Sequence, residues 1–347
     1  MSEQRIPIPE PSERARQEAQ RRLDGLVKPL GALGRLEELA AWLSAAQDSV
    51  PPREFGDVRV VVFAGDHGVA ERAAVSAYPR EITAAMVRVF RSGGSGVGVL
   101  AAQAGARVRV LDIAVDGELD LPAEVVRHKI RRGSGSIDIA DALTAEEAER
   151  AFAAGRAVAD EEIDSGADLL IPGDMGIGNT TVAAALVAAA LGLPAEDVVG
   201  SGTGVDDAGR ARKVEVVRAA LERAGHRAAA PLDLLTALGS ACAAATAGFL
   251  VQAAARRVPV LLDGVFSGAA ALVARELAPG AERWWLAGHR STEPAQSFAL
   301  KALGLEPILD LGLRLGEGSG AVQAVAVLRS ARAVLAEMSS LADLDLS

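Results

Sequence analysis

The stretch "DLLIPGDMGIGNTTVAAAL", residues 168–186, places a short apolar run, a glycine-rich turn and an alanine-rich segment one after another. A continuous apolar run such as 168–173 is typical of a strand covered on both faces, as in a parallel sheet. Glycines at the start of a helix let backbone N–H groups approach an anion, and the helix N-terminus adds its positive end. We therefore expect a strand, an anion-binding turn and a helix that starts with Asn179 and Thr180 in the N-cap position. A tight, well-capped turn without a ligand is the alternative for this segment taken alone.

The same alternation of strand and helix recurs on both sides of that stretch. Further strands are expected at 58–65, 107–115, 258–265, 283–288 and 307–313, and helices at about 12–47 and at 80–104, 144–165, 180–192, 207–224, 231–256 and 318–337. This order predicts an α/β fold with a mostly parallel sheet and helices on both faces. The first and last helices could pair into a small helical domain of residues 1–50 and 318–347 beside a large α/β domain of residues 51–317.

Composition excludes several classes of protein. Hydrophobic residues make up 50% of the 347 residues but aromatic residues only 3%, so the core must be built from Ala, Val and Leu. The net charge of −10 argues against nucleic acid or an anionic membrane as a partner. The single cysteine, Cys242, excludes an intramolecular disulfide and fits the reducing cytoplasm. The charged start has no signal-peptide pattern, and the uncharged run 234–255 is better explained as a buried helix than as a membrane span.

Glycine and a polar residue follow directly after several of the expected strands, where ligands bind in sheets of this kind. In "FAGDHGVA" (63–70), Asp66 and His67 could ligate a metal, but the other histidines show no ligand spacing, so hydrogen bonding at the rim of the site is favoured. In "GSGTGVDDAGRARK" (200–213), Lys213 could reach a phosphate. The alternative is a solvated helix face capped by Asp206 or Asp207.

Two further strand ends complete the set. "LAGHRSTEP" (286–294) places Gly288 and Ser291 beyond a strand, and "LGLRLGEGSGA" (311–321) places Glu317 alone among glycines and aliphatic residues. A phosphate cradle beside one isolated carboxylate suggests a nucleotide handled by general base chemistry. An apolar setting should raise the pKa of Glu317 and make it a better proton acceptor.

In their order and spacing, the motifs resemble the nicotinate-nucleotide:dimethylbenzimidazole phosphoribosyltransferase family, which makes the lower-ligand nucleotide of cobalamin. The resemblance covers roughly residues 20–337 and rests on "KPLGALGRLEELA", "GDHGV", "VSAYPREIT", "GDMGIGNTT", "GTGVDD" with Lys213, "LLDG" and "LDLGLRLGEGSGA". It implies a homodimeric cytoplasmic enzyme with a Rossmann-like sheet and a small helical domain. The implied reaction moves the phosphoribosyl group of nicotinate mononucleotide to a benzimidazole-type base, giving α-ribazole 5′-phosphate and nicotinate, with no cofactor and no metal.

The resemblance also implies roles for individual residues. Glu317 matches the general base, with Asp174 as a second catalytic carboxylate. The mononucleotide is expected at Gly176, Ile177, Gly178, Asn179, Thr180, Gly202, Thr203, Lys213, Ser291, Arg314, Leu315 and Gly316. The acceptor base is expected at Ser76, Tyr78, Ala85, Met86, Asp66 and His67.

The sequence departs from the family pattern at several places. Asp174 and Cys242 stand where the family usually has glutamates, and Ala85 stands where it usually has glutamine. Ser95 and Gly98 replace the usual Ala and Asn, and the segments 133–140 and 293–296 also differ. These changes leave the acceptor base open. The alternatives are a transferase for another base, a homologue that binds nicotinate mononucleotide with reduced turnover, and a metal-dependent phosphohydrolase that uses Asp66 and His67.

Overall fold

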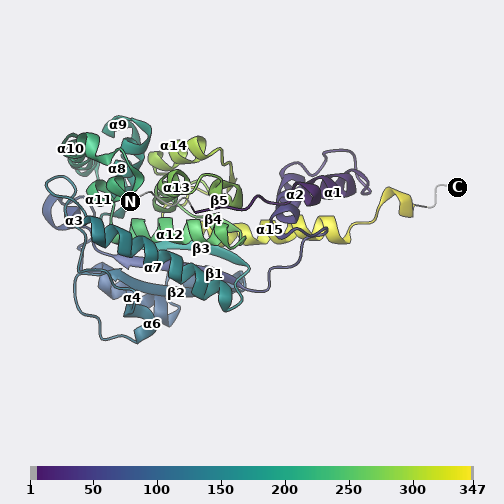
Figure 1. The fold of residues 1–347 in the computed structure, drawn as a ribbon, viewed down its shortest axis with the longest axis horizontal. Helices are drawn as coiled ribbons and strands as arrows, with labels where there is room; N and C mark the ends of the chain where they lie inside the picture. The colour runs from purple at the N-terminus through teal and green to yellow at the C-terminus, as the bar shows by residue number, and fades with distance from the viewer. Residues whose placement is uncertain (1–5, 345–347) are drawn as a thin grey trace.

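The structure, a computed structural model, describes residues 6–344 and contains one six-stranded, wholly parallel sheet within them. The strands lie in the order β2-β1-β3-β4-β5-β6, which confirms the predicted α/β fold (Figure 1). Their bounds are β1 (Val58–Gly65), β2 (Ala106–Ala114), β3 (Leu169–Met175), β4 (Val260–Leu262), β5 (Trp285–His289) and β6 (Pro307–Leu309).

Helices cover both faces of the sheet, because both sides of its strands are apolar. In β1, Val61 and Phe63 join one core cluster, and Val60 and Val62 join the other. The first cluster is covered by α7 (Ala145–Asp164), α8 (Asn179–Leu191), α10 (Asp207–Ala224), α11 (Pro231–Leu238), α12 (Ala241–Ala255), α13 (Val265–Leu277) and α14 (Pro294–Leu303). The second is covered by α4 (Ile82–Ser92), α5 (Gly96–Gln103) and α15 (Ser319–Glu337), and it extends along α15 to α1 (Glu13–Asp24) and α2 (Arg35–Gln47). Short helices complete the chain at α3 (Gly68–Ala73), α6 (Ala123–Val126), α9 (Ala195–Val198), η1 (Gly225–Ala228), η2 (Ala281–Trp284) and η3 (Leu341–Asp343).

Two predicted helices are each broken in two. The segment 80–104 forms α4 and α5, because Gly93 (φ 75°) ends the first helix and the Ser95 hydroxyl caps the second. The segment 231–256 forms α11 and α12, with Ser240 as the new N-cap. The strands predicted at 258–265 and 307–313 are shorter than expected, since they end at Leu262 and Leu309.

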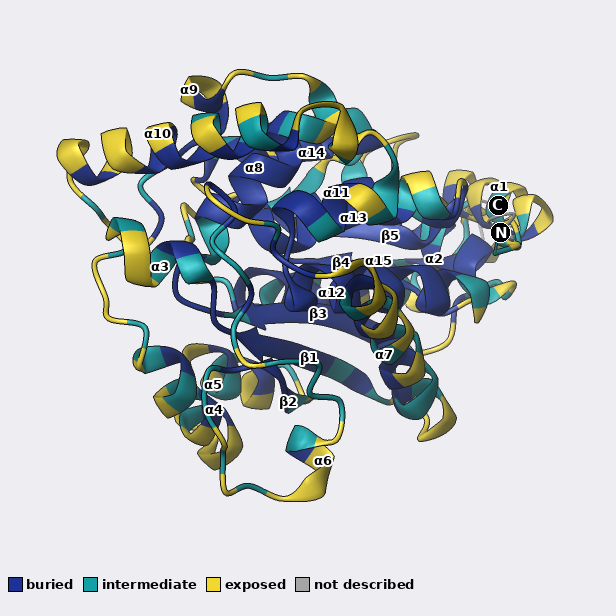
Figure 2. Cartoon of the chain, turned by 60° about the vertical axis from the view of Figure 1, so that its left-hand side comes forward, coloured by how far each residue is buried: buried dark blue, intermediate teal, exposed yellow. Residues whose placement is uncertain are grey.

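Closely packed small residues explain the aromatic-poor composition. Gly155 of α7 and Gly248 of α12 each face a carbonyl of the other helix, where an added Cβ would lie 1.8 Å from the Ala245 oxygen and 2.0 Å from the Phe152 oxygen. The side chains of α12 are buried almost throughout, which confirms the prediction for the uncharged run (Figure 2). Between residues 6 and 344, no helix combines the length and apolarity needed to cross a membrane.

The N-terminal helices lie beside the far half of α15, apart from the main sheet (Figure 1). Backbone hydrogen bonds join the two ends of the chain: Val27 N–H donates to the Ser339 carbonyl and Leu341 N–H to the Gly25 carbonyl. The near half of α15, however, packs on the sheet through Ala321 and Val322. The helix thus belongs to both parts, and the division into residues 1–50 with 318–347 and residues 51–317 stays a prediction.

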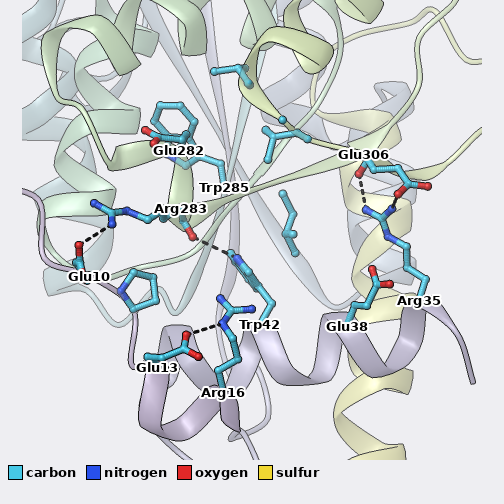
Figure 3. Close-up of a pocket in the computed structure, with 15 residues that line it drawn as sticks. Glu10, Glu13, Arg16, Arg35, Glu38, Trp42, Glu282, Arg283, Trp285 and Glu306 are labelled. Carbon is cyan, nitrogen blue, oxygen red and sulfur yellow. Dashed lines mark hydrogen bonds and ion pairs between the residues drawn. The ribbon is translucent and has the colours of Figure 1, made fainter. Parts of the chain in front are cut away.

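A cavity of about 620 Å³ lies between the N-terminal helices and the β5–α14 region, near the start of β5 (Figure 3). Its charged side chains are largely paired with one another, as in Arg283–Glu10 and Arg35–Glu306. It lies at the amino ends of β5 and β6, opposite to the carboxyl ends where ligands bind in such sheets. Its size therefore does not mark it as the reaction centre.

Candidate active site

A smaller pocket of about 90 Å³ lies at the carboxyl ends of β3 and β5. The strand order reverses between β1 and β3, ligands bind at such a switch point in parallel sheets, and the pocket lies on the β3 side of it. Eleven of the residues predicted from sequence line this pocket: Asp174, Gly176, Ile177, Asn179, Thr180, Gly202, Thr203, Ser291, Arg314, Leu315 and Gly316.

Glu317 follows the pocket-lining Gly316 and is held in an unusual backbone conformation. Its φ of 65° lies in the left-handed region, between Gly316 (φ 79°) and Gly318 (φ 92°). An added Cβ on Gly173 would lie 2.3 Å from the Glu317 carbonyl oxygen, so this segment rests directly on the backbone of β3. A non-glycine residue keeps such a conformation only when its surroundings enforce it, and such strain is found most often at functional sites.

The Glu317 carboxylate is almost fully buried and accepts one hydrogen bond, from Val97 N–H at 3.2 Å. Burial raises its pKa, the Val97 N–H opposes the rise, and the nearby Asp263 carboxylate adds to it. The predicted direction of the pKa shift is therefore present. The apolar setting is not the only influence on the pKa of Glu317, since the Val97 N–H in α5 lowers this pKa and the Asp263 carboxylate raises it.

Asp174, at the end of β3, is a second buried carboxylate. Asn179 donates its side-chain N–H to Asp174 Oδ2 at 2.5 Å, and Asn179 Oδ1 accepts from Thr180 N–H. Burial raises the pKa of Asp174 to about 7, opposed by the Asn179 hydrogen bond and reinforced by Asp263 and Glu317. The N-cap position of α8 belongs to Gly178, so the predicted capping by Asn179 and Thr180 is wrong, and Asn179 instead orients Asp174.

We expect Asp174→Asn to stabilise the protein, and more strongly at pH 8 than at pH 5. A carboxyl whose folded pKa is raised from 3.8 to about 7 favours the folded state less as pH rises through that range. One pKa unit is worth about 1.4 kcal/mol and the folded carboxyl stays protonated over the two units from pH 5 to pH 7, so the gain in the free energy of unfolding should be roughly 2.5 kcal/mol larger at pH 8 than at pH 5. Urea unfolding at both pH values measures it. A gain equal at the two pH values would mean that Asp174 is ionised in the folded protein throughout.

Lys213 lies inside the phosphate-binding region predicted around the second glycine turn. Its side chain is 1% exposed, and its Nζ donates to Thr180 Oγ1 at 3.0 Å and to the Gly200 carbonyl at 3.1 Å. Burial lowers its pKa, and Glu293 opposes that shift. The capping by Asp206 is correct, but the alternative of a solvated helix face is wrong for Lys213.

Glycine is required at position 202, where the two turns meet. Gly202 has a φ of 55°, and an added Cβ would lie 2.9 Å from Lys213 Nζ and 2.8 Å from Thr180 Oγ1. The Gly202 carbonyl accepts from Arg314 at 3.0 Å. The turns at 173–180 and 200–204, which lie far apart in the sequence, therefore meet at Lys213.

Several pocket residues were not singled out from the sequence. Glu293 is buried and accepts a hydrogen bond from Gly202 N–H at 2.7 Å. One backbone N–H of the predicted phosphate-binding turn at 200–204 is therefore already bonded to a carboxylate. Met175, Val265 and Phe266 supply apolar lining. The position of Glu293 shortly after β5 could have indicated a site residue. Nothing in the sequence distinguishes the three apolar lining residues from residues of the core.

The residues predicted to hold the acceptor base lie on the loops after β1 and α3 and in α4, and the structure brings only some of them together. The Ser76 hydroxyl lies 3.2 Å from Thr203 Oγ1 and so contacts the turn at 200–204. Met86 packs on the second core cluster. Tyr78 and Ala85 are exposed and lie outside the pocket lining, so the structure does not place them at the site as predicted.

Asp66 and His67 follow β1 and are both buried. Asp66 accepts from Asp116 N–H at 2.8 Å, and burial raises its pKa. Burial lowers the pKa of His67 to about 4, and its ring lies against Gly176 and Phe266. Within residues 6–344, no three His, Cys, Asp or Glu side chains are grouped as metal ligands.

The departures from the family pattern have identifiable places in the structure. Ser95 caps α5 and an added Cβ on Gly98 would clash with the Gly93 carbonyl, so both residues shape the turn that donates Val97 N–H to Glu317. Cys242 is buried behind Gly65, and burial raises the pKa of its thiol well above the usual value.

Comparisons with known proteins agree over nearly the whole chain. A family model described as phosphoribosyltransferase matches residues 8–345. The nicotinate-nucleotide–dimethylbenzimidazole phosphoribosyltransferase of Mycolicibacterium paratuberculosis is 58% identical over 330 residues, covering 95% of this chain and 94% of that protein. The enzyme of the same name from Mycobacterium tuberculosis is 55% identical over 341 residues, covering 98% and 94%.

Solved structures give the same result. The crystal structure of CobT from Thermus thermophilus superimposes with a TM-score of 0.91 at 45% identity, covering 95% of this chain and 98% of that one. A second structure from the same organism, of the nicotinate-nucleotide–dimethylbenzimidazole phosphoribosyltransferase, has a TM-score of 0.89 at 44% identity, covering 97% and 99%.

Proposed function

Because the chain belongs to the nicotinate-nucleotide–dimethylbenzimidazole phosphoribosyltransferase family, we propose that it transfers the phosphoribosyl group of nicotinate mononucleotide to a benzimidazole-type base. The products are α-ribazole 5′-phosphate and nicotinate, as in the assembly of the cobalamin nucleotide loop. The observation that carries the proposal is the buried Glu317 carboxylate beside two glycine turns that meet at Lys213.

Glu317 acts in this proposal as the general base. Nicotinate leaves from a positively charged pyridinium, so cleavage of the glycosidic bond neutralises a charge on the leaving group. The acceptor attacks C1′ with one ring nitrogen while the N–H on its other nitrogen becomes acidic. A carboxylate with a raised pKa within hydrogen-bond reach takes that proton. Asp174, oriented by Asn179, is the second carboxylate of the centre.

The phosphate is held by the turns at 173–180 and 200–204, with Lys213 as the positive charge. In a chain of net charge −10, a local donor set is needed to attract an anion. Gly176, Ile177, Gly178, Thr180, Gly202, Thr203 and Ser291 are proposed to surround the mononucleotide, with Arg314, Leu315 and Gly316 closing the side next to Glu317.

We expect Lys213→Ala to raise KM for nicotinate mononucleotide by about 10- to 100-fold, the size of a lost charge-assisted hydrogen bond. The kcat should change much less, because the ammonium contacts the phosphate and not the reacting atoms. Steady-state kinetics measure both. Lys213→Met keeps the buried volume as a matched variant, and Arg212→Ala, in the neighbouring exposed position, should leave both constants unchanged. An unaltered KM for Lys213→Met would show that the ammonium does not bind the phosphate.

The acceptor pocket should tolerate several benzimidazoles. Ser95 and Gly98, which shape the turn beside Glu317, are small, so we expect kcat/KM for unsubstituted and dimethylated benzimidazole to differ by less than about a hundredfold, or roughly 2.7 kcal/mol. Nicotinate release from the mononucleotide with a panel of benzimidazoles and phenols measures this and tests the proposed function. A larger preference for one base would contradict the expected tolerance. Faster transfer to phenols would favour the alternative of a different acceptor.

Two further properties belong to the proposal. A homodimer is proposed from the resemblance, together with the exposed apolar side chains of Leu311 and Leu315 beside the site; light scattering should give twice the chain mass of 35.6 kDa. A cytoplasmic location is proposed from the single, buried Cys242. The homologue with reduced turnover remains the second candidate, but a strained, buried Glu317 is not needed for binding alone.

A further inference from the structure

Asp263 lies directly after β4, and its carboxylate is 1% exposed. Its two oxygens accept three backbone hydrogen bonds: Oδ2 from Gly318 N–H at 3.1 Å, and Oδ1 from Gly320 and Ala321 N–H at 2.9 Å each. All three donors belong to the start of α15, whose own N-cap residue, Gly318, has no side chain to offer. The Asp263 side chain, just after β4, therefore supplies the N-cap that α15 lacks.

The first turn of α15 is also fixed by close contacts on its other sides. An added Cβ on Gly320 would lie 2.1 Å from the His289 ring, and one on Gly318 would lie 2.6 Å from Val60 Cγ1. His289 is 1% exposed, and its Nε2 lies 3.3 Å from Asp263 Oδ1, although the two atoms form no hydrogen bond. The turn therefore has little freedom to shift as long as Asp263 holds its N–H groups.

Glu317 is the residue immediately before this clamped turn. Its left-handed backbone conformation costs free energy, and Gly318, the next residue, donates its N–H to Asp263. We propose that Asp263 is the positioning residue of the reaction: by clamping the start of α15 it holds the Glu317 carboxylate in place. This inference rests on the proposed role of Glu317 as general base.

Asp263→Asn is the variant that tests the inference. The amide keeps one acceptor oxygen but places an NH₂ group against a backbone N–H, so one end of the clamp opens. Because a shift of about 1 Å in a catalytic group can cost about a hundredfold, kcat should fall roughly 10- to 100-fold. KM for nicotinate mononucleotide should change by less than about threefold, since the phosphate turns lie elsewhere. Thr144→Ala, which removes the cap of α7 away from the site, controls for the loss of a helix cap and should leave kcat unchanged.

The decisive arm repeats Asp263→Asn in the Glu317→Gln background. A residue that acts through Glu317 has nothing left to position there, so the second change should lower kcat by less than about threefold. If the two effects multiply instead, Asp263 acts independently of Glu317 and the inference is overturned. Should Asp263→Asn not fold, Gly320→Ala displaces the same turn while keeping every carboxylate, and the same non-additivity is expected.

Hydrogen exchange separates this inference from the proposed function. In Asp263→Asn, the backbone amides of residues 318–321 should exchange about tenfold faster than in the unaltered protein, whether or not transfer is observed. Unchanged exchange there would overturn the clamp even in an active enzyme. Absence of transfer by the unaltered protein, with the exchange result as expected, would overturn the proposed function alone.

Discussion

Glu317→Gln should lower kcat by about 10²–10⁴, or roughly 3–5 kcal/mol of activation free energy, the usual cost of losing a positioned general base. The amide keeps the shape of the side chain and can still accept the hydrogen bond from Val97 N–H. It cannot take the acceptor's proton. The loss should fall on kcat, because the phosphate of the mononucleotide is held by other loops.

Folding should survive this change. Burial and Asp263 both raise the pKa of Glu317, so a neutral amide removes an unfavourable buried charge. Thermal unfolding of the variant should therefore occur at or above the temperature of the parent. A variant that keeps kcat within about threefold of the parent would show that Glu317 is not the base.

The double change Glu317→Gln with Asp174→Asn should abolish the activity that remains after the first. Asp174 is a buried carboxylate that lines the pocket, and its pKa of about 7 lets it accept a proton near neutral pH. Nicotinate release by the double variant should equal the rate without enzyme. As the matched control, the single change Asp174→Asn should retain measurable transfer. If the double variant is as active as Glu317→Gln alone, the residual rate does not depend on Asp174.

Apolar runs and glycine turns were sufficient to predict the sheet, because both features act locally. A strand such as 168–173 is apolar on both faces wherever it lies, and the turn after it must be glycine-rich for the backbone to pass closely. The helix break at Ser240 was missed because small apolar residues continue across it, whereas the break at Gly93 lies in "RSGGSG" (91–96), whose glycines did signal it. At both places the capping residues, and not the hydrophobic pattern, determine where one helix ends and the next begins.

The sequence also indicated Glu317, which stands alone among glycines and aliphatic residues, and the family resemblance indicated Asp174. The sequence could not indicate what surrounds them. The hydrogen bond from Val97 to Glu317 joins residues 220 apart and the clamp by Asp263 joins residues 55 apart, and no local pattern encodes such contacts. Asp263 stands in "LLDG", which has the same strand, acid and glycine order as the other sites, so its place could have been predicted but not its role.

The most direct test of the proposed transfer incubates the unaltered protein with nicotinate mononucleotide and 5,6-dimethylbenzimidazole and quantifies both products by chromatography. We expect nicotinate and α-ribazole 5′-phosphate in equal amounts, and no nicotinate when the base is left out. Nicotinate released equally fast without the base would show a hydrolase, and bound mononucleotide without any release would show a binding protein; either result would contradict the proposed transfer.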